Sequence, residues 1–252
     1  MSNWDAGQYL KFERQRTQPA MDLAMRVRSC APKRIADIGC GPGNSTAVLR
    51  EVFPEAAILG IDSSTGMIER AHAKYPELQF RICDALSLEG GYDLLFSNAC
   101  LQWIAHHDTL IPALMQKLVP GGILAVQIPI NGEEPLFRLI REIADEPRWR
   151  LQGVPLQPNE TLTPEEYYDI LSGCSASFEI WETKYYHSLP DHEALVEWVK
   201  GTRIRPYLAC LSEEQGAAFE NEILKGAKAL YPVMQNGGVV LGFRRLFFVA
   251  AV

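Results

Sequence analysis

Short apolar runs alternate with amphipathic segments through the first half of the chain. The apolar runs at residues 34–38, 57–62, 78–83, 92–97 and 123–128 predict five strands. Helical spacing of apolar residues predicts helices between them, at residues 45–52, 63–75 and 107–119. Strands that alternate with helices in this way predict a parallel sheet with right-handed crossovers. The loops at the carboxyl ends of such strands form the ligand crevice.

The regular alternation of strands and helices changes after Ile128. Helices are predicted at residues 134–145, from 163 onward, at 191–200 and at 213–230, with strands at 178–188 and 239–252. We interpret the late helices as a cap inserted around a strand pair that completes the sheet. A single domain over residues 1–252 then has four parts: a helical segment at 1–30, a cofactor-binding core at 31–130, cap insertions around strand six at 131–238, and a closing strand at 239–252.

Composition narrows the class of ligand. The 252 residues are 47% apolar and carry a formal net charge of −7, with no run of lysine or arginine. The apolar fraction is large enough to form a full core. The negative net charge disfavours binding to nucleic acid. It also disfavours an anionic substrate unless a local basic patch compensates.

Cysteine spacing and the start of the chain indicate the compartment. The six cysteines form no C-x-x-C pair and lack zinc-ligand spacing, so we expect reduced thiols and no metal. The first residues have neither a basic segment nor an apolar segment of a signal peptide, and no apolar stretch is long enough to span a bilayer. We therefore expect a soluble cytoplasmic protein; its oligomeric state is open, and a monomer is compatible with the sequence.

A glycine-rich turn follows the first predicted strand. Residues 37–44 read Asp-Ile-Gly-Cys-Gly-Pro-Gly-Asn, where glycines permit a tight turn and close approach of the backbone to a ligand. The G-x-G-x-G spacing differs from the G-x-G-x-x-G of dinucleotide-binding enzymes. S-adenosylmethionine (AdoMet) has no phosphate but has an ammonium group, which suits Asp37 at the end of the strand.

Polar residues also end the next three strands. Asp62 stands where an acid binds ribose hydroxyls, Asp84 suits the adenine amino group, and Asn98 suits the methionine moiety. A single aspartate after a strand is more often a helix cap or turn residue, but four such features at consecutive strand ends favour a ligand site. The residues predicted to bind AdoMet are Asp37, Gly39, Cys40, Gly41, Asn44, Asp62, Ser63, Met67 (over the adenine face), Asp84, Ala85 and Asn98.

Beyond these motifs, the sequence resembles the trans-aconitate methyltransferases over nearly its whole length. The resemblance includes the glycine loop, residues 97–103, the Pro-Gly-Gly at 120–122 and the Phe-Arg-Arg-Leu-Phe at 243–247. Its most specific stretch is residues 197–208, Glu-Trp-Val-Lys-Gly-Thr-Arg-Ile-Arg-Pro-Tyr-Leu. The resemblance implies a Rossmann-like class I methyltransferase fold, with a seven-stranded, mostly parallel sheet, an antiparallel last strand and a helical cap. It also implies AdoMet as cofactor, S-adenosylhomocysteine as product, and methyl ester formation on a carboxylate of trans-aconitate.

The sequence departs from the family pattern in three segments. Gln18 replaces the second arginine of an Arg-x-Arg-Pro-Ala segment, and Ile130 replaces the acid of Pro-Asp-Asn. A Ser-His pair after Glu-Pro is replaced by Leu136 and Phe137. These changes lie near the expected acceptor side, so they leave the AdoMet prediction intact and the identity of the acid open.

The acceptor acid needs cations and hydrogen-bond donors. Arg205 is the candidate carboxylate fork, and Lys200, Arg203 and Arg205 supply a local basic patch. The alternatives are a solvated helix end at 200–205 and a core position for Trp198. The residues predicted on the catalytic and acceptor side are Arg16, Trp103, Trp198, Lys200, Thr202, Arg205 and Tyr207, with His106 and His107 as further candidates for a base that more often are helix-start residues.

Other functions remain open at this point. A methyltransferase with a different small acceptor fits the three departures. A nicotinamide-dependent oxidoreductase is disfavoured by the glycine spacing and by the lack of a Tyr-x-x-x-Lys set. A non-catalytic AdoMet-binding module is disfavoured by the intact loop and the full cap.

Overall fold

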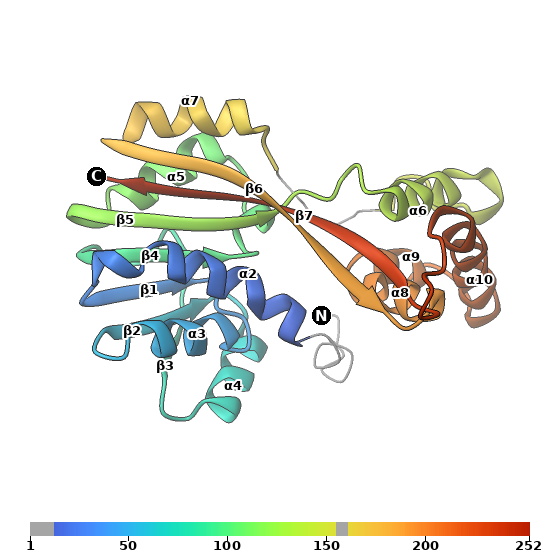
Figure 1. The fold of residues 1–252 in the computed structure, drawn as a ribbon, viewed down its shortest axis with the longest axis horizontal. Helices are drawn as coiled ribbons and strands as arrows, with labels where there is room; N and C mark the ends of the chain where they lie inside the picture. The colour runs from blue at the N-terminus through green and yellow to red at the C-terminus, as the bar shows by residue number, and fades with distance from the viewer. Residues whose placement is uncertain (1–12, 155–160) are drawn as a thin grey trace. The chain divides into compact units, whose positions relative to one another are not determined.

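A computed structural model describes residues 13–154 and 161–252 (Figure 1). Its seven strands form one sheet in the order β3-β2-β1-β4-β5-β7-β6, which confirms the predicted fold class. The strands are β1 (Arg34–Ile38), β2 (Ala57–Asp62), β3 (Gln79–Ile82), β4 (Tyr92–Asn98), β5 (Leu118–Pro129), β6 (Ser177–Leu189) and β7 (Val239–Ala251). No helix in the described part of the chain has the length and apolar character needed to cross a membrane.

The strand order creates a switch point beside β1. The chain passes from β1 through α3 (Asn44–Val52) to β2, and through α4 (Thr65–Lys74) to β3, before it returns to β4 on the other side of β1. Strands β1 to β5 pair in parallel, whereas β7 runs antiparallel to β5. In sheets of this kind, ligands bind at the carboxyl ends of the strands that flank the switch point, here β1 and β4.

The chain forms two compact units, which we describe separately. Among the described residues, the core unit comprises 14–129, 161–183 and 245–252. The cap unit comprises residues 130–154 and 184–244 of the described chain. The core unit also holds α2 (Glu13–Arg26), α5 (His107–Met115) and α7 (Pro164–Cys174), and the short 3-10 turns Arg28–Cys30 and Leu101–Trp103.

One boundary in the core unit differs from the prediction. The helix expected at 107–119 ends at Met115, and β5 begins at Leu118 rather than at residue 123. The backbone of Lys117 explains the early start, because its carbonyl accepts hydrogen bonds from Gly91 and Tyr92 at the beginning of β4. Pairing then shifts register after Tyr92, so the Pro-Gly-Gly segment lies within the strand instead of before it.

The buried His107 ties α5 to α7. Its Nε2 lies 2.9 Å from the carbonyl of Leu101, and its Nδ1 lies 2.7 Å from the hydroxyl of Tyr167. Since a carbonyl only accepts, Nε2 carries the proton and Nδ1 accepts from Tyr167. This arrangement favours the structural reading of His107 over a role as a base.

We expect Tyr167→Phe to lower the free energy of unfolding by about 1–3 kcal/mol, because it leaves a buried histidine nitrogen without its donor. Both Tyr167 and His107 are fully buried. Thermal or denaturant unfolding measures the loss, and Tyr168→Phe is the control because Tyr168 is 58% exposed. A large fall in turnover by the folded Tyr167 variant, with stability unchanged, would instead give the histidine a chemical role.

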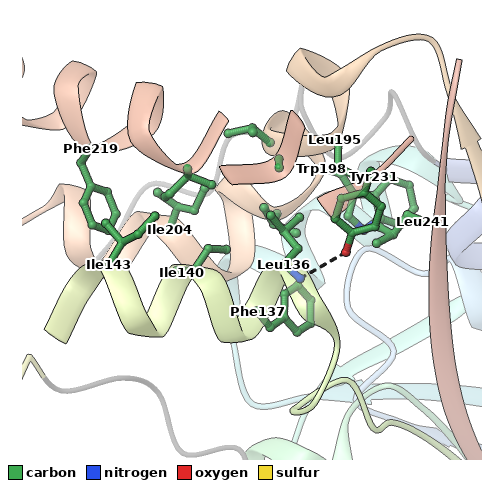
Figure 2. Packing of buried hydrophobic residues seen from close by; sticks show 14 of the residues in the cluster. Leu136, Phe137, Ile140, Ile143, Leu195, Trp198, Ile204, Phe219, Tyr231 and Leu241 are labelled. Atoms are coloured by element: carbon green, nitrogen blue, oxygen red, sulfur yellow. Dashed lines mark hydrogen bonds between the residues drawn. The ribbon is translucent and has the colours of Figure 1, made fainter. Parts of the chain in front are cut away.

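In the described part of the chain, the cap unit contains helices, a single-turn 3-10 helix at Pro147–Trp149, and the parts of β6 and β7 at residues 184–189 and 239–244. The helices are α6 (Pro135–Asp145), α8 (His192–Val199), α9 (Arg205–Leu208) and α10 (Glu213–Leu230), and a π-helical turn at Lys200–Ile204 joins α8 to α9. In Figure 2, side chains from α6, α8 and α10 meet in one apolar cluster. Leu136 and Phe137, which depart from the family pattern, lie in this cluster, so their apolar character serves packing within the cap unit.

The π-helical turn was not predicted, since the sequence suggested one helix over 191–200. The amide of Arg205 donates to the carbonyl of Lys200, five residues earlier, which defines the wider turn. Pro206 follows directly and has no amide hydrogen, so the regular α-helical bond from that position cannot form. Wide turns of this kind occur frequently at functional sites.

Candidate active site

The glycine loop joins β1 to α3 through positive φ angles. Gly39, Gly41 and Gly43 have φ values of 70°, 54° and 88°. The amides of Gly39 and Cys40 donate to the carbonyl of Ile61 on β2, at 2.8 and 2.9 Å. A Cβ atom at position 39 would lie 2.0 Å from Sγ of Cys100, whereas one at Gly41 would meet no atom within 4 Å. Gly39 therefore permits close packing inside the protein, and Gly41 borders open space.

Asp37 is fully buried beneath this loop. Its Oδ2 accepts hydrogen bonds from the hydroxyls of Ser45 and Thr46, each at 2.6 Å. Its Oδ1 has no hydrogen-bond partner among the described residues. Burial raises the pKa of Asp37 to about 6, although the two hydroxyls lower it, and the negative charge of Asp62 adds to the rise. A bound ammonium group would supply both a partner and an opposite charge.

Asn98 presents a second such oxygen at the end of β4. Its Oδ1 is buried and has no partner in the described part of the chain. Strands β1 and β4 are neighbours, with Asp37 paired to Phe96, so both oxygens lie at the carboxyl edge of the sheet. Two buried acceptors at one edge fit a cationic ligand group, as the AdoMet prediction requires.

Asp62 connects the loop to the segment before α4. Its Oδ2 accepts from the amide of Gly41 at 3.0 Å, and its Oδ1 accepts from the amide of Ser64 at 2.8 Å. The carboxylate is partly exposed, and each oxygen has capacity for a further hydrogen bond. It is therefore free to accept from vicinal hydroxyl groups as well.

The remaining residues that were predicted to bind AdoMet differ in how far they are exposed. Asp84 is exposed, lies two residues beyond β3, and its Oδ1 accepts from the amide of Leu86 at 2.8 Å. Ser63 is exposed, Met67 is half-buried and Ala85 is buried.

Asn44 and Cys40 have other local roles in the structure. The Oδ1 of Asn44 accepts from Nζ of Lys74 at 2.8 Å and from the hydroxyl of Tyr75 at 3.1 Å, which directs it to the end of α4. Cys40 is buried, and burial raises the pKa of its thiol. The loop thus uses hydrogen bonds to unite Gly39, Gly41 and Asp62, whereas the side chain of Asn44 is held elsewhere.

The residues that were predicted to bind the acceptor differ in their burial and in their contacts. Lys200 forms an ion pair with Glu220 at 2.8 Å, and Trp198 is buried in the cap cluster, stacked on His187 with ring centroids 4.7 Å apart. Tyr207 is buried against Phe219. Trp103, in the core unit, is 44% exposed.

Three further acceptor candidates are placed only in part. Arg205 is the first residue of α9. The side chains of Arg16 and Thr202 lie outside the described part of the protein. Their roles, like those of the other acceptor residues, stay predictions.

The cap unit also contains a pocket that the sequence did not reveal. Its volume is about 310 Å³, and its lining includes Ile130, Asn131, Glu134, Lys184, Tyr186 and Arg244. Lys184 and Tyr186 are alternate residues of β6, and Val240, Gly242 and Arg244 are alternate residues of β7. The period of two along each strand was a usable signal, but the pairing of β6 with β7 is needed to bring these positions together.

Comparison with known proteins places this geometry in a family. Residues 35–122 match the family described as "Methyltransferase domain". A trans-aconitate 2-methyltransferase of Methylobacterium nodulans is 46% identical over 254 residues, which cover 99% of this chain and 98% of that protein. The chain belongs to the trans-aconitate 2-methyltransferase family. Members of this family from Klebsiella pneumoniae and Escherichia coli O157:H7 are 41% and 43% identical, each with 99% of this chain and 98% of the relative covered.

Solved structures of lower identity share the fold of this family member. A putative methyltransferase from Bacillus halodurans C-125 superposes with a TM-score of 0.59 at 10% identity, covering 92% of this chain and 97% of that one. A plantazolicin methyltransferase in complex with S-adenosylhomocysteine gives 0.53 at 15% identity, covering 97% and 89%. The resemblance seen in the sequence is therefore confirmed at the levels of family and fold.

Proposed function

We propose that this protein transfers the methyl group of AdoMet to a carboxylate of trans-aconitate, forming a monomethyl ester and S-adenosylhomocysteine. The observation that carries the proposal is the row of polar groups at the carboxyl ends of β1, β2 and β4, in a chain of this family. Relatives over 40% identical along nearly the full chain bear the name trans-aconitate 2-methyltransferase.

The polar groups of the core unit match the parts of AdoMet. Asp37 and Asn98 offer buried oxygens to the ammonium end. Asp62 offers its remaining acceptor capacity to the ribose hydroxyls, and Asp84 offers an exposed carboxylate to the adenine amino group. When bound, AdoMet supplies a methyl group on a positively charged sulfur.

A carboxylate acceptor does not require a general base from the protein. A carboxylic acid with an ordinary pKa near 4 is already ionised at neutral pH, so no residue has to remove a proton. The protein has to hold the acid in line with the methyl group and keep water away. We assign this holding role to cations and donors of the cap unit, with Arg205 as one candidate.

Turnover with labelled AdoMet and a set of acids tests the function. We expect trans-aconitate to have a higher kcat/KM than cis-aconitate, citrate or isocitrate, and mass spectrometry to find one added methyl per molecule. Transfer to none of these acids would contradict the proposal. A second candidate, methylation of a different small acid, is favoured by Ile130, which lines the cap pocket where the family pattern has an acid; a preference for another acid in this set would establish it.

A further inference from the structure

The pocket of the cap unit has the composition of a small anion site. We propose that Lys184, Asn131 and Arg244 in this pocket bind a carboxylate of the acceptor, and that the pocket thereby selects polycarboxylic acids. The inference rests on the proposed function, since it names the part of the cap unit that recognises the acid. A volume of about 310 Å³ is at the small end of the range for ligand pockets and suits a molecule of this size.

Lys184 is held across the neighbouring strand. A Cβ atom at position 242 would lie 2.3 Å from Cε of Lys184, so the lysine side chain occupies space that only a glycine on β7 leaves open. Its Nζ lies 5.3 Å from the centre of the Tyr186 ring. Among the described residues it has neither an ion-pair nor a hydrogen-bond partner, so its charge is available to a ligand.

Asn131 contributes a donor with a fixed orientation. The residue is only 3% exposed, and its Oδ1 accepts from the amide of Arg244 at 2.7 Å. Because that amide requires an acceptor, the side-chain amide cannot be reversed, and Nδ2 must be the other group. Within the described chain, Nδ2 is buried without a hydrogen-bond partner. A buried donor in this state favours an added acceptor such as a carboxylate oxygen.

The carboxylates around the pocket already have local partners. Oε2 of Glu134 accepts from the amide of Leu136 at 2.8 Å, and its Oε1 accepts from the hydroxyl of Tyr231. Burial raises the pKa of Glu134, although these hydrogen bonds and the positive charge of Lys184 lower it. Glu133 lies 3.8 Å from Arg141. Among the described residues, neither glutamate forms an ion pair with Lys184, so its Nζ can still contact an anion in the pocket.

Two variants separate the charge of Lys184 from its position. Lys184→Gln removes the charge, and Gly242→Ala keeps the charge but displaces the side chain. We expect each to lower kcat/KM for trans-aconitate about tenfold or more, as for loss of a charge-assisted hydrogen bond, mainly through KM. The affinity for S-adenosylhomocysteine, measured by calorimetry, should change less than about twofold. Lys228→Gln is the matched control, because Lys228 is another lysine of the cap unit, paired with Glu193.

Each outcome decides between the pocket and the proposed function. If the wild type methylates trans-aconitate and Lys184→Gln behaves like Lys228→Gln, the pocket proposal is wrong and the function stands. If the wild type methylates no acid, calorimetry with trans-aconitate and citrate in the presence of S-adenosylhomocysteine decides. Binding that is lost in Lys184→Gln supports the pocket without the function, and absence of binding to the wild type overturns both.

Discussion

Asp62→Ala should reduce the affinity for AdoMet and S-adenosylhomocysteine by about 100-fold or more, the largest effect expected on binding. The carboxylate holds the amides of Gly41 and Ser64 and, in our proposal, the ribose hydroxyls as well. Hydrogen bonds to a charged group contribute about 1.5–3 kcal/mol each, so loss of two to the ribose gives an effect of this size. Calorimetry with S-adenosylhomocysteine measures it independently of the acceptor.

Asp93→Ala is the matched control for this experiment. Oδ2 of Asp93 accepts from the amides of Lys33 and Arg34, at 3.1 and 2.7 Å, so it too binds two backbone amides. It stands near the beginning of β4, at the opposite edge of the sheet from Asp62. The control should lose stability but keep its affinity for S-adenosylhomocysteine. Equal affinity in the Asp62 variant and the wild type would remove Asp62 from the ligand site.

Asp37→Asn should have two opposite effects, a more stable protein without ligand at pH 8 and weaker binding of AdoMet. Burial raises the pKa of Asp37 from the usual 3.8 to about 6, so the folded state binds a proton where the unfolded chain has already lost it. The free energy of unfolding therefore falls as pH rises from about 4 to 6, by about 3 kcal/mol in total, and the cost persists above pH 6. Asparagine is uncharged, like the protonated acid, so the variant does not lose this free energy of unfolding.

Denaturant unfolding from pH 4 to pH 8 tests the stability effect. The difference between Asp37→Asn and the wild type should be near zero at pH 4, grow up to about pH 6 and then stay constant. Calorimetry at pH 8 should show weaker binding of S-adenosylhomocysteine, because the amide offers no negative charge to the ammonium group. A variant that is less stable than the wild type at every pH would contradict the assigned cost of the buried charge.

The sequence predicted which residues lie at the carboxyl edge of the sheet better than it predicted the contacts around them. Asp37 and Asp62 could be placed because the carboxyl ends of parallel strands meet at one edge, whatever the exact register. Asn44 could not, because its partners Lys74 and Tyr75 lie 30 and 31 residues away and have no local signal. Lys184 was not predicted as a site residue because its position depends on the glycine opposite it on β7. The spacing of residues along one strand does not reveal that pairing.

The hydrogen bonds of the glycine loop also determine which of its amides a ligand can use. Amides at the start of a helix usually cradle phosphate groups. Here the amides of Gly39, Cys40 and Gly41 are all directed inward, to Ile61 and Asp62 of β2. A phosphate group beside these three amides would find them already bonded and would meet the negative charge of Asp62. A ligand group without phosphate is therefore favoured beside the first part of the loop, and no bulky residue is needed there to disfavour a phosphate.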